Sequence, residues 1–279
     1  MKKNPFKKLY SQTKIDHKSS NDLTKYAANL FTLSFLLTQI AIPTLELFKP
    51  SKALADTTAL GTGANASGLD STAIGDSSNA SNTAATAIGK SSNATGTASS
   101  ALGSSAQATA VFSTAVGYSA TAGGDNSFAG GYLADAAGDN SVAAGTLADA
   151  SGSNSIAIGN QADAANNQSI AIGFSTDAAF GALAIGTAAQ ASSYGTASGY
   201  NAQATNTNAT ALGSSSTASG VASTALGFNA SATAENQIAI GNSDANVTVA
   251  GTLDVTGDTS VSTFDSSGAT QLATGGGAT

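Results

Sequence analysis

A repeat of glycine with a fixed phase runs through most of this 279-residue chain. The glycines recur every 14 residues from Gly61 to Gly241, except for two steps of 13 residues between Gly173 and Gly199. An alanine stands two residues before every one of these glycines, beginning with Ala59. A flexible Gly/Ser linker has no phase to keep, so the repeat predicts an ordered repeat architecture despite the low-complexity appearance of the sequence.

Alternation within each repeat predicts two short strands joined by turns. In residues 155–159, Ser-Ile-Ala-Ile-Gly, the small residues share one face of a strand and the aliphatic residues share the other. In residues 161–164, Gln-Ala-Asp-Ala, alanine alternates with polar residues, and turn-rich runs such as residues 165–168 separate the two halves. We therefore expect an all-β parallel solenoid of about fourteen coils over residues 56–245, each coil 13–14 residues long.

The short turns limit what such a coil can hold inside. Sheets that face each other with Leu or Ile pack about 10 Å apart, which turns of this length can hardly span. Only Ala, Ser and Gly are small enough for the space between the two strands of a coil. We therefore expect the repeating Gly and Ala to fill the interior, and we do not interpret them as a ligand cradle.

The aliphatic residues one and three positions before each repeat glycine would then point outward, in a stripe along the rod. A contiguous apolar stripe of that size is not tolerated on a soluble monomer, so it predicts burial against other copies by cyclic association. This argument predicts an oligomer without fixing the number of chains. The opposite flank is polar and is expected to face water: Asn65, Asn79, Asn93, Gln107, Asp135, Asp149, Asp163 and Asp177.

Charge divides the chain into two unlike parts. Residues 1–55 carry nine of the ten Lys, the one His and a net charge of +6, whereas residues 56–279 carry only Lys90 against fourteen acids. Beyond residue 55 there is no His, Cys, Arg or Met from which to assemble the usual acid–base, nucleophilic or zinc sites. A surface this acidic also repels phosphate backbones. We therefore expect no enzyme activity, no cofactor and no nucleic-acid partner.

The two ends of the chain are expected to differ from the repeats. Residues 1–55 resemble an export signal, with a basic start, an uncharged apolar run at residues 30–42 and a small-x-small motif that predicts cleavage between Ala55 and Asp56. The apolar run is shorter than the roughly 20 residues of a membrane span, so no span is expected in the mature chain. Residues 246–279 form a Thr/Gly-rich, β-like tail, in which Val247 and Val249 alternate with other residues as in a strand.

A six-residue motif carries a resemblance to a known family. Asn-Ser-x-Ala-x-Gly occurs at residues 140–145 and 154–159, with Gln in place of Asn at residues 168–173. It resembles the head repeat of YadA-like trimeric autotransporter adhesins, over residues 57–245. The resemblance implies a left-handed parallel β-roll, a homotrimer, display on the outer surface of a Gram-negative-type cell, and a role in virulence through adhesion to host or matrix molecules.

The resemblance also implies that the aliphatic residues of the motif lie at the trimer interface. The candidates are Ile74, Ile88, Leu102, Val116, Ile156, Ile158, Ile170, Ile172, Ile185, Leu212, Leu226 and Ile240. Members of the family continue into a neck, a heptad stalk and a membrane-anchoring barrel, for which residues 246–279 show no pattern beyond a possible start of a neck or stalk. We therefore expect a truncated product, a head anchored by a partner, or a released rod.

The leading hypothesis for function is adhesion without catalysis, by a rigid rod that repeats weak contacts. Candidate ligand contacts are the aromatic residues directly after a repeat glycine, although such residues also fill seams between chains: Tyr118, Tyr132, Phe174, Tyr200 and Phe228. The acidic flank lacks the nonapeptide of calcium-binding β-rolls and is interpreted as solvated surface. The alternatives are a structural fibre, such as the shaft of a phage-type tail fibre, and an ice-binding solenoid, whose Thr ladder would be interrupted at Ser100.

Overall fold

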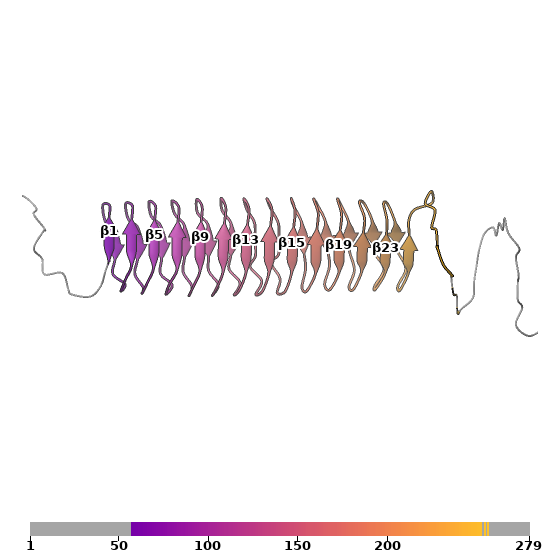
Figure 1. Ribbon diagram of the computed structural model, residues 1–279, viewed down its shortest axis with the longest axis horizontal. Helices are drawn as coiled ribbons and strands as arrows, with labels where there is room; N and C mark the ends of the chain where they lie inside the picture. The colour runs from indigo at the N-terminus through magenta and orange to yellow at the C-terminus, as the bar shows by residue number, and fades with distance from the viewer. Residues whose placement is uncertain (1–56, 253, 255, 257–279) are drawn as a thin grey trace, which may run out of the picture. The chain divides into compact units, whose positions relative to one another are not determined.

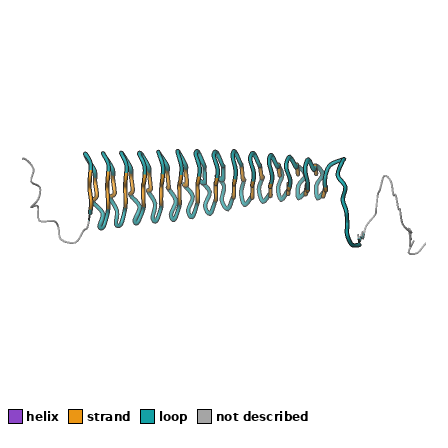
Figure 2. The backbone as a smooth tube through the Cα atoms, turned by 45° about the horizontal axis from the view of Figure 1, so that its top comes forward, coloured by secondary structure: helices purple, strands orange, loops and turns teal. Residues whose placement is uncertain are grey.

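The chain folds into a stack of flattened coils that runs in one direction, as the computed structural model shows for residues 57–252, 254 and 256 (Figure 1). Within these residues every strand pairing is parallel and no helix occurs. The coils lie on one another with the two strands of each repeat on opposite flanks, and turns close both edges (Figure 2). The all-β parallel solenoid expected from the repeat is confirmed. The leader at residues 1–55 and the cleavage point at Ala55 and Asp56 lie outside the described residues.

One flank is a single fourteen-stranded sheet with one strand from each repeat. Its strands, in order, are β1 (Thr58–Leu60), β3 (Thr72–Ile74), β5 (Thr86–Ile88), β7 (Ser100–Leu102), β9 (Thr114–Val116), β11 (Phe128–Gly130), β13 (Val142–Ala144), β14 (Ile156–Ile158), β15 (Ile170–Ile172), β17 (Leu183–Ile185), β19 (Thr196–Ser198), β21 (Thr210–Leu212), β23 (Thr224–Leu226) and β25 (Ile238–Ile240). Each strand pairs with the equivalent residues of the next repeat, so that Ala157 lies beside Ala171. The two 13-residue repeats keep this register because their deletions fall in turns.

The other flank is divided into two shorter sheets. A six-stranded sheet contains β2 (Asn65–Ala66), β4 (Asn79–Ala80), β6 (Asn93–Ala94), β8 (Gln107–Ala108), β10 (Thr121–Ala122) and β12 (Asp135–Ala136). A five-stranded sheet contains β16 (Asp177–Ala178), β18 (Gln190–Ala191), β20 (Gln203–Ala204), β22 (Thr217–Ala218) and β24 (Ser231–Ala232). Between them the flank continues only as isolated bridges through Asp149 and Asp163.

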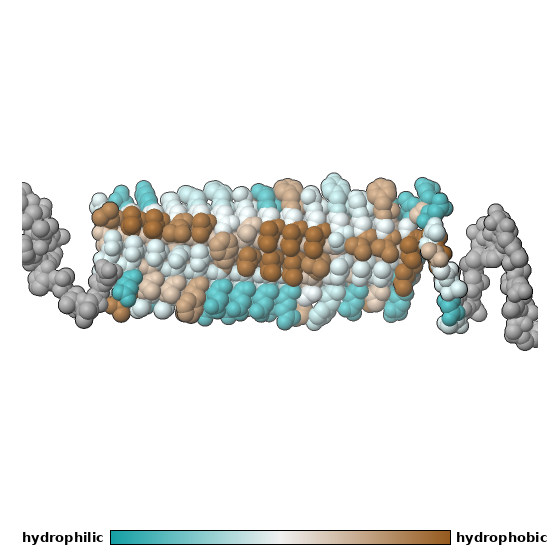
Figure 3. All heavy atoms as spheres, viewed as in Figure 1, coloured by the Kyte–Doolittle hydropathy of each residue, from teal (hydrophilic) through white to brown (hydrophobic). Residues whose placement is uncertain are grey.

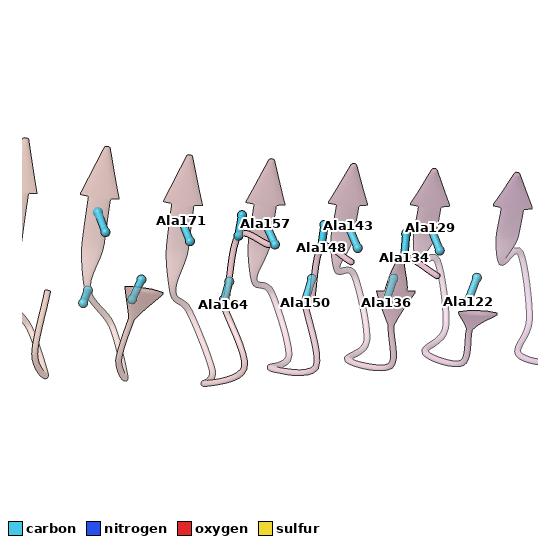
Figure 4. Packing of buried hydrophobic residues seen from close by; sticks show 14 of the residues in the cluster. Ala122, Ala129, Ala134, Ala136, Ala143, Ala148, Ala150, Ala157, Ala164 and Ala171 are labelled. Carbon is cyan, nitrogen blue, oxygen red and sulfur yellow. The ribbon is translucent and has the colours of Figure 1, made fainter. Parts of the chain in front are cut away.

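Alanine and serine make up almost the whole interior, as the thin coil requires. Ala143 and Ala157 from the large sheet, and Ala148 and Ala150 from the opposite flank, are buried in the narrow space between the flanks (Figure 4). Threonine, at Thr176, is the largest fully buried side chain among the described residues. Buried serines cap the turns, because their hydroxyls donate to the carbonyl three residues earlier.

The repeat glycines serve the turns, which corrects the expectation that they fill the interior. Gly159 is partly exposed at the end of β14, with a φ of +136° that side-chain-bearing residues rarely adopt. A Cβ at this position would lie 2.2 Å from the carbonyl oxygen of Gly173 in the next coil. Glycine is therefore required at this corner by both the backbone conformation and the close stacking of the coils.

After β25 the described chain forms no further strand up to residue 252, and Val247 and Val249 are exposed. The rest of the 246–279 tail lies outside the described residues, apart from residues 254 and 256. Among the residues described, no helix is long and apolar enough to cross a membrane.

Candidate interaction surfaces

The large sheet presents an apolar stripe to solvent, formed by the residues one position before each repeat glycine. Figure 3 shows it as a hydrophobic band along the face of this sheet, with interruptions. The exposed fraction of these side chains reaches 64% at Leu60 and is 36% at Ile74 and Leu102. The alternation predicted from the sequence therefore places the aliphatic side chains outside the coil, and the single chain leaves them uncovered.

The twelve predicted interface residues fall into two neighbouring columns of this sheet. Ten stand one residue before a repeat glycine, and all of these are exposed except Ile172, which is half-buried. The other two, Ile156 and Ile170, stand three residues before a repeat glycine and are half-buried. The first of these columns lacks a large aliphatic side chain at Gly130, Ala144 and Ser198. At Gly130 the ring of Phe128 covers the place of a Cβ at a distance of 2.7 Å. The structure thus brings Ile74, Ile88, Leu102, Val116, Ile158, Ile172, Ile185, Leu212, Leu226 and Ile240 into one column.

The predicted aromatic contact residues lie at the turn that follows the large sheet. Tyr118 and Tyr132, from neighbouring coils, stack with their ring centroids 5.5 Å apart and their planes inclined by 11°. Phe174, Tyr200 and Phe228 are exposed in the same column but are separated by coils that carry other residues there. Of the five candidates, only Tyr118 and Tyr132 form a joint surface.

Two further apolar residues were missed by the sequence analysis. Leu133 and Leu147 stand two positions after a repeat glycine, beside the tyrosines, and both are exposed. Both adopt left-handed backbone conformations, with φ of 53° and 56°. Every other described coil has Ser, Asn, Gln, Ala or Gly at this position, so the column itself contained the signal.

The polar flank contains four aspartates stacked in register in consecutive coils: Asp135, Asp149, Asp163 and Asp177. Burial, and after it the carboxylate of Asp149, raise the pKa of Asp135. Burial, and after it the carboxylate of Asp163, raise the pKa of Asp177. Within the described part of the chain no group of three or more His, Cys, Asp or Glu side chains is arranged to hold a metal ion.

Two of the aspartates, Asp149 and Asp163, also change the backbone pairing between coils. Asp149 Oδ1 accepts a hydrogen bond from the Ser151 N–H, and Asp163 Oδ1 accepts one from the Ala165 N–H, each at 3.0 Å. In an amide-bearing coil the equivalent N–H, that of Thr95, instead donates to the Ala108 carbonyl of the next coil. Asp side chains satisfy the backbone two residues ahead, so they compete with the sheet.

The comparison with family models agrees with the repeat architecture. The model of the YadA head domain repeat, which spans two copies, matches segments that together make up more than half of the chain: residues 55–78, 66–92, 80–106, 94–120, 108–134, 122–148, 150–176, 193–216 and 218–243. Among solved structures, the collagen-binding domain of the Yersinia adhesin YadA is 25% identical over 71% of this chain and 82% of that chain, with a TM-score of 0.36. A comparison with curated proteins found no match.

Proposed function

This chain belongs to the YadA head-repeat family, and from that premise we propose that it is the non-catalytic head of a cell-surface adhesin. In this proposal three copies associate into a rigid rod that is exported, displayed at the cell surface, and attaches to host, matrix or other surfaces. Matrix collagen is the first ligand to test, because the similar solved domain is a collagen-binding one.

The exposed apolar stripe is the observation that carries the proposal. It runs with interruptions along the fourteen-stranded sheet, and a stripe of this length on a soluble protein needs a partner surface. A second copy offers the same stripe in the same register, and the family resemblance implies three copies around one axis. The candidate interface residues named above are then the seam between the chains.

A repetitive rod also suits adhesion by many weak contacts. Parallel coils are spaced by about 4.7 Å along the stack, so each surface column repeats its side chains at that interval. Joining many such contacts in one rigid body raises avidity without any single strong site. The exposed aromatic residues at the turns are candidates for these contacts.

Sedimentation equilibrium tests the trimer. We expect residues 56–279 to sediment with the mass of three chains. The double variant Ile158→Asp/Ile172→Asp is expected to sediment as a folded monomer, because it places two charges in the seam of each copy. The matched control is Asn154→Asp/Gln168→Asp, which places the same charges in the same two coils at exposed turn positions away from the stripe. A folded wild-type monomer, or a trimer that survives Ile158→Asp/Ile172→Asp, would contradict the proposed assembly.

Attachment is tested by coating beads with the protein and measuring their retention on immobilised collagen and on other matrix proteins. We expect retention that depends on assembly and is lost with the charged seam variant. Equal retention of wild-type beads and beads coated with an unrelated acidic protein would contradict the adhesin function.

A further inference from the structure

Four exposed apolar residues outside the stripe gather at one turn of three adjacent coils. Tyr118 and Tyr132 are 54% and 50% exposed, and Leu133 and Leu147 are 39% and 44% exposed. We call these four residues the turn patch. Backbone hydrogen bonds join these neighbouring coils at the patch. The Leu133 N–H donates to the Tyr118 carbonyl, and the Leu147 N–H donates to the Tyr132 carbonyl.

The fold does not require these residues at the turn. Leu133 and Leu147 occupy left-handed backbone positions, where bulky side chains are disfavoured and where Ser91, Ser105 and Gln161 form the same turn in other coils. In the coil of Leu133 the stripe does not require that leucine either, because the Phe128 ring covers Gly130. Leucine at these two positions therefore adds exposed apolar surface where a small or polar residue would serve the fold better.

The turn patch borders the acidic column. In the coil of Gly199, Gln203 Nε2 donates a hydrogen bond of 3.4 Å to Asn201 Oδ1. Side chains two and four positions after a repeat glycine are therefore neighbours. The equivalent neighbours of the patch leucines are Asp135 and Asp149.

Charge identifies the kind of partner that fits this surface. Lys90 is the one cationic side chain in residues 57–252, and it lies two coils before Tyr118. A second copy of the chain brings the same acidic surface, and like charges across an interface are unfavourable. A basic partner instead meets aspartates for its cations and tyrosine faces for cation–π contacts.

We propose that the turn patch docks an extended basic segment of a partner protein in which apolar side chains alternate with Lys or Arg. The apolar side chains of the segment cover Tyr118, Tyr132, Leu133 and Leu147, and its cations pair with Asp135 and Asp149. The proposal rests on the proposed adhesive function and assigns one of its contact sites.

A labelled peptide in which Lys and Tyr alternate tests the proposal directly, with fluorescence anisotropy as the readout. We expect Leu133→Ser/Leu147→Ser to weaken binding by about tenfold, which corresponds to about 1.4 kcal/mol. Serine is the residue of this column in other coils, so the variant keeps the turn. The control Val111→Ser/Val221→Ser removes exposed aliphatic side chains from other turns and is expected to leave binding unchanged.

The charge requirement is tested with Asp135→Asn/Asp149→Asn, since amides occupy this column at Asn79 and Asn93. We expect this variant to bind the Lys/Tyr peptide more weakly than the wild type does. Its affinity for the peptide should also decrease less than that of the wild type when the salt concentration is raised from low to physiological. A peptide in which Glu and Tyr alternate is expected not to bind. Equal binding of the Glu and Lys peptides, or equal effects of the leucine and valine variants, would overturn the proposal.

Sedimentation and bead retention separate this proposal from the proposed function. A lower assembled mass for Leu133→Ser/Leu147→Ser would place the patch between copies of the chain and overturn the docking site. Retention that fails for the wild type, together with peptide binding that depends on the patch and the aspartates, would contradict the adhesin function and leave the docking site standing. Normal assembly and retention of the wild type, without peptide binding, would remove only the docking site.

Discussion

The coils around Asn65, Asn79 and Asn93 and the coils around Asp135, Asp149 and Asp163 share one core but have different outer columns. In the first region the amides form a ladder: Asn65 Nδ2 donates to Asn79 Oδ1, and Asn79 Nδ2 donates to Asn93 Oδ1, both at 2.8 Å. In the second region the carboxylates have no donor to offer one another. Like charges directly beside each other on neighbouring strands destabilise a sheet.

The two regions also differ in their backbone pairing and in the hydrogen bonding of their buried side chains. The amide region is part of a continuous sheet, whereas Asp149 and Asp163 join the flank only through isolated bridges. The buried side-chain oxygens without a hydrogen-bond partner in the described residues all lie in the aspartate region: Ser127 Oγ, Asp135 Oδ1, Ser141 Oγ and Ser155 Oγ. Coils of the same repeat type therefore differ in how fully their polar groups are hydrogen-bonded, and three of the four turn-patch residues, Tyr132, Leu133 and Leu147, lie in the less satisfied region. Departures from local rules of this kind are expected at functional sites.

The largest effect is expected where the two regions are alike. Ala87 and Ala157 are both completely buried in the thin core, so replacing either with Leu should cost about 3 kcal/mol of unfolding free energy. Urea unfolding measures both, with Ala137→Leu at an exposed position as the control. A much smaller cost at Ala157 than at Ala87 would show that the core, and not only the outer column, differs between the regions.

An exchange of outer residues tests the comparison itself. Asp149→Asn/Asp163→Asn is expected to stabilise the rod at neutral pH by about 1–2 kcal/mol, because it removes the like-charge contacts and keeps an oxygen for the backbone N–H groups. The reverse change, Asn79→Asp, should destabilise it, since aspartate cannot donate to Asn93. Thermal unfolding measures both. Destabilisation by the Asp149→Asn/Asp163→Asn variant would mean that the carboxylates stabilise their coils.

The repeat made the architecture predictable, because a phase kept over fourteen glycines determines which residues share a column. The thin alanine core followed from the turn length, and the exposed stripe followed from alternation. The role of the repeat glycine could not be predicted correctly, because its requirement comes from a positive φ and from the backbone of the next coil at Gly173, neither of which alternation reports.

Only part of the turn patch could be predicted from the sequence. Leu133 and Leu147 are the two leucines in a column that otherwise holds small or polar residues, but their exposure beside Asp135 and Asp149 is known only from the folded turn. The stacking of Tyr118 on Tyr132 follows from their identical position in successive coils, so the spacing of the repeat glycines is enough to predict it. Neighbours within a turn depend on backbone conformation, whereas neighbours between coils depend only on the repeat.

The buried serines provide a smaller test of the same comparison. Ser99 Oγ donates to the Gly96 carbonyl at 2.7 Å, so Ser99→Ala is expected to cost about 1 kcal/mol. Ser141 Oγ has no partner, so Ser141→Ala should be neutral or slightly stabilising. Urea unfolding of the two variants gives the difference. Equal costs would mean that the Ser141 hydroxyl is satisfied in solution.

The smallest expected effect is a pH dependence confined to the aspartate region. The pKa values of Asp135 and Asp177 are raised above 3.8, mainly by burial and then by the neighbouring carboxylates. Folded carboxyls with raised pKa values take up protons before unfolded ones do, so the region gains stability as the pH falls from neutral toward 4 and loses it as the pH rises. The gain should be about a few tenths of a kcal/mol, because both groups are partly exposed to screening solvent. Hydrogen-exchange protection, corrected for intrinsic rates, should therefore rise at residues 135–178 and stay constant at residues 79–94. A uniform change along the rod would instead trace the pH dependence to its overall negative charge.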